Sequence, residues 1–113
     1  MAKLLWKPSG EQIQNSNMYR FMNVINEKYH QNFSEYAPLY EWSIGNIADF
    51  WETLWEFADI IASKPHDQAI DDVTKMPGAR WFSGARLNFA QNLLRFQDDK
   101  AALIFKGEGQ PST

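Results

Sequence analysis

The sequence predicts a mainly α-helical domain with minor β-structure. Apolar residues recur at steps of three and four over residues 17–29, 43–63 and 86–96, the spacing that gives a helix one buried face. Short extended runs occur near residues 81–82 and over 101–105, where brief strands would fit. The chain has 113 residues, 44% of them hydrophobic and 15% aromatic, so one packed domain is feasible without disulfides.

The first two helices carry clear signals at their ends. Ser9 can cap a short helix, because Gln12 occupies the reciprocal position of a capping box. Residues 17–29 follow with one apolar stripe, and the pattern ends at His30. Residues 33–40 are rich in aromatic rings but contain Pro38, so we expect a loop there.

The longest predicted helix covers residues 43–63. Ser43 or Asn46 can cap its start, and Lys64-Pro65 is a stop signal. Its wide apolar face places Trp51 in the expected core, where replacement by alanine would cost about 3–5 kcal/mol. An exposed face of that size would otherwise favour aggregation.

The second half of the chain alternates short elements with turns. Residues 67–76 fit either a short strand or one helical turn, and Pro77-Gly78 predicts a turn. Residues 81–82 form a brief extended pair, and residues 86–96 read as the third main helix. Residues 101–105 fit a buried strand whose partners lie outside this chain, followed by a polar linker over 107–113.

Charge and composition exclude several classes of partner. Residues 1–63 carry four Lys/Arg and eight Asp/Glu, a net charge of −4, which argues against nucleic acid and against anionic membranes. No apolar run reaches the roughly 18 residues of a membrane span, and no secretory signal is evident. With no cysteine either, we expect a cytoplasmic protein without thiolate metal sites.

No group of residues predicts catalysis, cofactor binding or metal binding. The chain has no phosphate-binding loop, and its serines lack a nucleophile-elbow context. His30 and His66 follow helix-end patterns, where histidine is favourable to the helix dipole. The neighbouring carboxylates at residues 71–72 and 98–99 fit solvated or capping positions. We therefore assign no catalytic, cofactor or metal residue.

One segment interleaves cations with aromatic rings. Arg80 and Arg86 flank Trp81 and Phe82, so this segment could grip a phosphate group or stack on a base. The structural interpretation, in which arginine stacks on tryptophan or pairs with a carboxylate, is favoured because phosphate sites usually add backbone donors.

The stretch over residues 81–94, with Trp81-Phe82, a glycine, Leu87-Asn88 and Asn92-Leu93, resembles the N-terminal region of acyl-CoA synthetases of the acetyl-CoA synthetase type. Residues 5–9, 40–44 and 50–57 are similar to the acetoacetyl-CoA synthetase branch of that adenylate-forming family. The likeness runs from about residue 5 to residue 105.

The resemblance implies a helical N-terminal domain of an α/β adenylate-forming ligase. Residues 1–100 would form that domain, and residues 101–113 would begin the large domain with its first strand. The parent ligase would use ATP, Mg²⁺ and coenzyme A, with catalytic groups downstream, and the remainder of that chain would be this domain's partner. The alternative is a free-standing helical interaction module that uses the face of residues 43–63.

Overall fold

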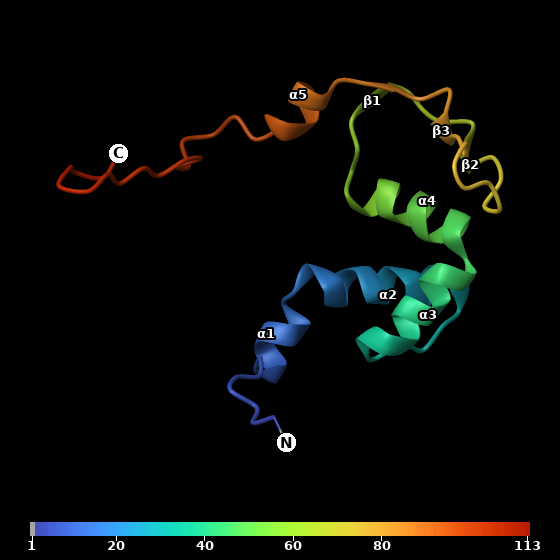
Figure 1. Ribbon diagram of the computed structural model, residues 1–113, viewed down its shortest axis with the longest axis horizontal. Coiled ribbons are helices and arrows are strands. Elements are labelled where there is room, and N and C mark those ends of the chain that lie inside the picture. The colour runs from blue at the N-terminus through green and yellow to red at the C-terminus, as the bar shows by residue number, and fades with distance from the viewer. Residues whose placement is uncertain (1) are drawn as a thin grey trace.

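The computed structural model describes residues 2–113 (Figure 1). Four helices come first: α1 (Gly10–Gln14), α2 (Asn17–Tyr29), α3 (Tyr36–Gly45) and α4 (Ile47–Phe57). Four short strands follow: β1 (Ala62–Lys64), β2 (Gln68–Ile70), β3 (Trp81–Ser83) and β4 (Arg86–Leu87). Helix α5 (Phe89–Leu93) leads into an extended C-terminal arm, residues 96–113, so the predicted mainly α class with minor β-structure fits the described chain.

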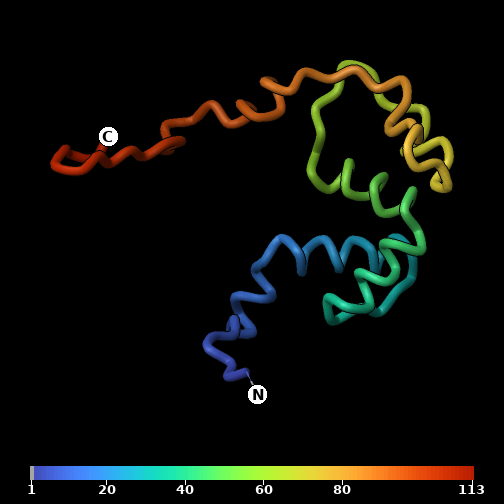
Figure 2. The backbone as a smooth tube through the Cα atoms, in the orientation of Figure 1, coloured from blue at the N-terminus to red at the C-terminus, as the bar shows by residue number. Residues whose placement is uncertain are grey.

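The chain is far from compact. Its radius of gyration is 19.0 Å, whereas a compact domain of this length would have roughly 13 Å. The backbone trace in Figure 2 shows why, because the arm runs away from the helices and strands instead of folding back onto them. The helices and strands thus form one part of the molecule, and the arm projects from it.

Helices α1 and α2 confirm the first two predictions. The N–H of Ser9 donates to Gln12 Oε1 over 2.9 Å, and the N–H of Gln12 donates to Ser9 Oγ over 3.2 Å, which completes the capping box. Helix α2 has the predicted bounds, with Ser16 as N-cap and His30 as C-cap in the left-handed conformation, φ 55°.

The predicted loop over residues 33–40 is wrong for its second half, because α3 begins at Tyr36. Pro38 lies in the first turn of α3, where a backbone N–H has no partner within the helix, so its missing N–H costs no helical bond. The N-cap is Glu35, whose side chain makes no capping bond.

The predicted helix over residues 43–63 is also wrong in its extent. Asn46 has a non-helical backbone, φ −135° and ψ 57°, and divides α3 from α4. Helix α4 ends at Phe57, and Asp59 then adopts a left-handed conformation, φ 53°, that turns the chain toward β1. The apolar periodicity continued across both breaks, so it did not reveal them.

The four strands form two antiparallel pairs. In the β2–β3 pair Gln68 faces Ser83 and Ile70 faces Trp81, so the open choice for residues 67–76 resolves to a strand over 68–70. The predicted Pro77-Gly78 turn and the extended pair at 81–82 are confirmed.

The β1–β4 pair joins Lys64 to Arg86, so the predicted helix over residues 86–96 is wrong at both ends. Residues 86–87 pair with β1 instead of starting a helix. Only five residues, α5, are helical, and Asn88 caps them by accepting a hydrogen bond from the Gln91 N–H over 3.1 Å.

The core lies between α2, α3 and α4. Its buried residues are Phe21, Met22, Ile25 and Leu39, and α4 contributes Phe50, Leu54 and Phe57. Trp51 points elsewhere and is 39% exposed, so the expectation that it lies in the core is wrong. The reason is that α4 has two apolar faces, and Trp51 lies on the face toward the β2–β3 pair, where its ring meets Trp81.

The arm contains the residues for which a strand with partners outside the chain, and then a linker, were predicted. Residues 101–105 form no strand in the described chain, and Leu103 is 91% exposed. Residues 107–113 are not a simple linker, because they turn back until Thr113 and Phe105 exchange backbone hydrogen bonds. A strand needs a partner along its length, and here only the pair at Phe105 is present.

Candidate docking surface

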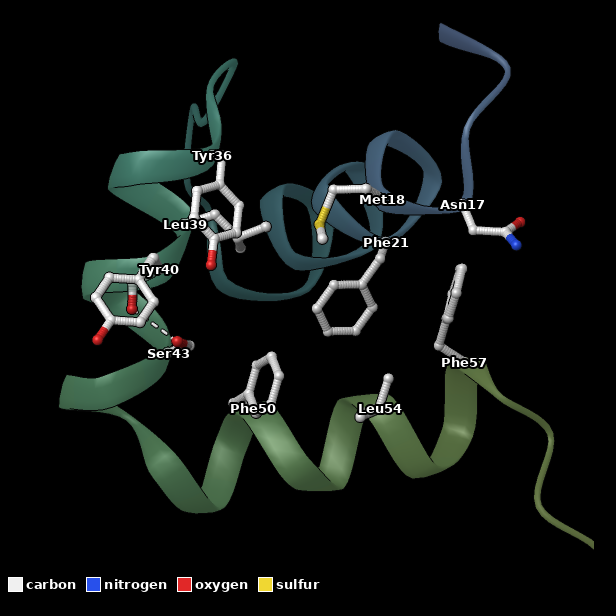
Figure 3. A pocket seen from close by; sticks show the side chains of 10 residues that line it. All are labelled: Asn17, Met18, Phe21, Tyr36, Leu39, Tyr40, Ser43, Phe50, Leu54 and Phe57. Carbon is white, nitrogen blue, oxygen red and sulfur yellow. Dashed lines mark hydrogen bonds between the residues drawn. The ribbon is translucent and has the colours of Figure 1, made fainter. Parts of the chain in front are cut away.

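A groove opens between the three core helices. It encloses about 470 Å³, and Figure 3 shows side chains from α2, α3 and α4 converging on it. The residues lining it are Asn17, Met18, Phe21, Tyr36, Leu39, Tyr40, Ser43, Phe50, Leu54 and Phe57. Because almost all are apolar or aromatic, the groove suits an apolar group and offers little for catalysis.

A buried polar network fixes α2 against α4 beside this core. Thr53 is fully buried, and its hydroxyl lies 3.0 Å from the Tyr29 hydroxyl. Lys28 Nζ donates to Glu56 Oε2 over 3.1 Å and to Thr53 Oγ1 over 3.4 Å. Partial burial is the largest single influence and lowers the pKa of Lys28, but the hydrogen bond to Glu56 and the further interactions with Tyr29 and Glu56 together outweigh it, so the net shift is upward. Packing and hydrogen bonds together therefore set the distance between the two helices.

His66 joins α4 to the β2–β3 pair. Its Nε2 lies 2.7 and 2.8 Å from the two carboxylate oxygens of Glu52, and its ring packs on Trp55 and Phe82 with centroids 4.8 and 5.1 Å away. The side chain is 7% exposed, and Nδ1 is buried without a hydrogen-bond partner. His66 therefore binds Glu52 instead of lying at a helix end, and His30 is an exposed C-cap.

Asn92 and Arg95 hold α5 against the end of α4. Asn92 Oδ1 accepts from the Ile61 N–H over 2.8 Å, and Asn92 Nδ2 donates to the Ile61 O over 2.9 Å. Arg95 Nη1 donates to the carbonyl oxygens of Ala58 and Asp59 over 3.2 and 2.8 Å. These carbonyls follow the last turn of α4, where a cation is favourable. Asn92, one of the two asparagines in the motif at residues 81–94, thus has a structural role that sequence spacing did not indicate.

Asp71 and Asp72 organise the turn between β2 and β3. Asp71 Oδ1 accepts from the Arg80 N–H over 2.8 Å, and Asp72 Oδ1 accepts from the Thr74 N–H over 2.9 Å. The Arg80 N–H, helped by Lys75, lowers the pKa of Asp71 below its ordinary 3.8, and the bonds from Thr74 lower that of Asp72. This confirms the capping interpretation of these carboxylates.

The lowered pKa of Asp71 predicts a loss of stability in acid. A carboxylate whose pKa is depressed by folding stabilises the fold above its unfolded pKa, and this contribution is lost as pH falls below about 4. We expect Asp71→Asn to lower the midpoint of thermal unfolding at pH 6 and to weaken its fall between pH 5 and pH 3. Asp99→Asn, at an exposed position, is the control. Equal acid sensitivity in the Asp71 variant and the unmodified chain would contradict the assignment.

Arg80 and Arg86 lie on different parts of the fold. Arg80 precedes β3, whereas Arg86 lies in β4, and both side chains are exposed. Neither guanidinium pairs with a carboxylate or lies over an aromatic ring within residues 2–113, so the structural interpretation of these two arginines is wrong. Neither lines the groove between α2, α3 and α4.

A second apolar surface covers α5 and the arm. Its side chains are 60–91% exposed and belong to Phe89, Leu93, Leu94, Phe96, Leu103, Ile104 and Phe105. So many exposed large apolar residues in one stretch mark a surface that another body covers. We call these seven residues the α5–arm surface.

The described chain shows neither a metal-binding cluster nor a membrane-spanning helix. Residues 2–113 contain no group of three or more His, Asp or Glu side chains placed to hold a metal ion. Over the same residues, no helix has both the length and the apolarity needed to cross a bilayer.

Comparison with known proteins places this chain. The sequence profile described as "Acetyl-coenzyme A synthetase N-terminus" matches residues 36–93. The chain is 34% identical over 111 residues to the acetoacetyl-CoA synthetase of Danio rerio and 37% identical over 108 residues to the acetoacetyl-coenzyme A synthetase of Rhizobium meliloti. Both alignments cover 96% of this chain and 16% of the relative.

A solved structure has the same shape. The acetoacetyl-CoA synthetase from Streptomyces lividans superposes with a TM-score of 0.78 at 28% identity, over 99% of this chain and 18% of that one. The likeness therefore includes the projecting arm, and the present chain spans only about a sixth of these proteins. Because the profile covers half of the sequence and the relatives align along nearly all of it, the chain belongs to the acetyl-coenzyme A synthetase N-terminus family.

Proposed function

We propose that this chain serves as the non-catalytic N-terminal domain of an acetoacetyl-CoA synthetase-like ligase. Residues 1–100 form the domain proper, and residues 101–113 begin the large adenylate-forming domain. Its role is mechanical: the α5–arm surface packs on the large domain and keeps it folded. In such a ligase, ATP with Mg²⁺ activates acetoacetate to an acyl-adenylate, which coenzyme A then converts to the thioester, all with groups outside this chain.

One observation carries the proposal. The α5–arm surface is 60–91% exposed and nothing within residues 2–113 covers it, yet the whole chain superposes on the Streptomyces lividans enzyme with a TM-score of 0.78. The arm's hydrogen bonds among residues 105–113 do not account for the direction in which it projects. A larger body that buries the arm supplies the reason, since burial of apolar area stabilises the extended conformation.

Activity measurements test the proposal directly. The 113-residue chain mixed with ATP, Mg²⁺, acetoacetate and coenzyme A should form no AMP and no thioester. The longer polypeptide that carries it should form both, and deletion of residues 1–100 should leave that polypeptide unstable. Adenylate formation by the short chain alone would refute the proposed role.

Substitution in the α5–arm surface separates docking from folding. Phe96 is 82% exposed, so Phe96→Glu should change the unfolding free energy of the 113-residue chain by less than about 0.5 kcal/mol. In the longer ligase the same change should bury a charge and sharply lower the yield of soluble, active enzyme. Gln91→Glu, an exposed polar position on α5, is the matched control. Equal yields of the two ligase variants would show that Phe96 is not covered.

Two other functions have less support. A free-standing module that binds a partner helix could use the groove, but every relative described above is an acyl-CoA synthetase of which this chain is one part. A coenzyme A site at Arg80 and Arg86 would need convergent groups, and these two lie on different elements. We expect that titrating the isolated chain with coenzyme A leaves its melting temperature unchanged; a rise would favour a ligand site.

A further inference from the structure

Two consecutive rings of β3 face the same side of α4. Trp81 meets Trp51 with ring centroids 5.8 Å apart, and Phe82 meets Trp55 with centroids 4.8 Å apart. Trp51 and Trp55 are four positions apart and therefore lie on one face of α4. Successive side chains of a regular strand point to opposite sides of the sheet, so a regular β3 could not bring both of its rings to this face.

The backbone of Phe82 accounts for this arrangement. Its φ is 49°, in the left-handed region that a residue with a Cβ atom rarely adopts. Strained residues of this kind cluster at binding and active sites, where the surrounding structure holds them in place. The left-handed conformation turns the Phe82 side chain toward α4, so that the rings of Trp51, Trp81 and Phe82 gather at one place.

These three rings line an open cleft. The cleft encloses about 320 Å³, and its lining consists of Trp51, Trp81 and Phe82. The two indole planes are inclined at 75°, so they form two walls of a corner. Trp51 is 39% and Trp81 47% exposed, which leaves the cleft open to solvent. In Figure 1 the arm runs away from the β2–β3 pair, so the cleft lies apart from the arm.

The lining of the cleft selects the charge of a ligand. The face of an aromatic ring is the negative part of its quadrupole, and tryptophan attracts cations most strongly among the aromatic side chains. Residues 1–63, which include α4, carry four Lys/Arg against eight Asp/Glu, and this net charge of −4 also favours a cation. The cation that lies over a ring within residues 2–113 is Lys28, above Tyr29, so the chain's own cations leave the cleft open.

The lining also selects the kind of cation. An ammonium or guanidinium group has N–H donors that lose free energy when they leave water without finding an acceptor. Three aromatic side chains supply no oxygen acceptor for such donors. A quaternary ammonium group has no N–H to satisfy, and its methyl groups can pack directly on the ring faces.

We propose that the cleft between Trp51, Trp81 and Phe82 binds the quaternary ammonium group of a choline-type compound. Two observations carry the proposal: the left-handed Phe82 that completes the cleft, and a lining made only of aromatic rings. The site goes beyond the proposed function and is independent of it, because it uses residues of this chain alone and takes no part in the ligase reaction.

Choline and its neutral carbon analogue, in which a tert-butyl group replaces the trimethylammonium group, are a matched pair of probes. At constant ionic strength, we expect choline chloride to give saturable NMR shifts of the indole N–H signals of Trp51 and Trp81 in the 113-residue chain. The neutral analogue should bind roughly threefold more weakly or worse, because the attraction of the ring faces for charge is lost. Equal affinities would show an ordinary apolar surface, and choline without saturable shifts would show no site; either result overturns the proposal.

Substitutions test the location of the site. Trp81→Leu should weaken choline binding by roughly threefold or more, and Trp81→Phe, which keeps a ring with a weaker quadrupole, should have a smaller effect. Trp6→Leu is the matched control, because Trp6 is 70% exposed and lies outside the cleft. If Trp81→Leu does not fold, Trp81→Phe replaces it. A folded Trp81 variant that binds choline as tightly as the unmodified chain would place the binding elsewhere and overturn the proposal.

Vesicles distinguish a free ligand from a lipid headgroup that carries the same cation. The chain should bind free choline and should not sediment with vesicles of phosphatidylcholine. Sedimentation that both free choline and Trp81→Leu abolish would instead identify the headgroup as the source of the quaternary ammonium group. Sedimentation that neither abolishes would involve another surface and would overturn the assignment to this cleft.

Discussion

Replacing Ile25 with alanine is expected to lower the free energy of unfolding by about 2–5 kcal/mol. Ile25 is fully buried at the centre of the cluster formed with Phe21, Met22 and Leu39. The substitution removes apolar contacts and leaves a cavity that helices fixed by the Thr53–Tyr29 hydrogen bond cannot easily close. Urea denaturation followed by circular dichroism measures the change.

Ile44→Ala is the matched control for this prediction. Ile44 lies on α3 and is 56% exposed, so its loss should change the unfolding free energy by less than about 1 kcal/mol. Trp51→Ala should fall between the two, because Trp51 is partly exposed and packs mainly on Trp81. If Ile25→Ala and Ile44→Ala cost the same, the core does not lie between α2, α3 and α4.

Replacing Asn92 with leucine is expected to cost about 2–3 kcal/mol. The substitution removes both hydrogen bonds to Ile61, whose backbone N–H and O are partly buried and would lose their partners. It also removes the acceptor that Arg95 Nη2 uses at 3.0 Å. The end of α4 and the start of α5 should therefore separate, and amide exchange at Ile61 should accelerate.

Two variants sharpen the Asn92 prediction. Asn92→Asp keeps the oxygen that accepts from Ile61 but loses the donor, so it should lose about 1 kcal/mol or more. Gln91→Leu, one residue away, likewise replaces a side-chain amide with leucine but at an exposed position. It should leave the free energy of unfolding almost unchanged. An Asn92→Leu variant as stable as Gln91→Leu would show that the contact with Ile61 does not hold α5 in place.

Sequence signals that act over a few residues correctly predicted the helices that are stabilised by contacts close in the sequence. Ser9 and Gln12 identify the start of α1, and the apolar stripe of residues 17–29 gives the bounds of α2, because capping and periodicity act within a few residues. The same signals failed over residues 43–63. An apolar face can continue through a break, and although Asn46 was a candidate helix cap and does occupy the N-cap position of α4, it did not indicate that a separate helix, α3, ends just before it.

The sequence predicted that the candidate site is an apolar surface, but it predicted only part of the location of that surface. The sequence indicated apolar segments that need a covering body, and placed them on residues 43–63 and on residues 101–105. The structure packs the α4 part of residues 43–63, partly buried, against α2, α3 and the β2–β3 pair, and leaves α5 and the arm exposed. Asn92 carries no signal of its contact with Ile61, since the two are 31 positions apart in the chain.

The sequence by itself determined the helical class, the absence of cysteine chemistry, and the likeness to an acyl-CoA synthetase N-terminus, because composition, periodicity and motif need no partner. Only the tertiary structure decided that α4 lies between two layers, that His66 binds Glu52, and that residues 101–105 extend into solvent. Those features depend on contacts between distant residues, and the order of residues alone does not fix which of several apolar faces finds a neighbour.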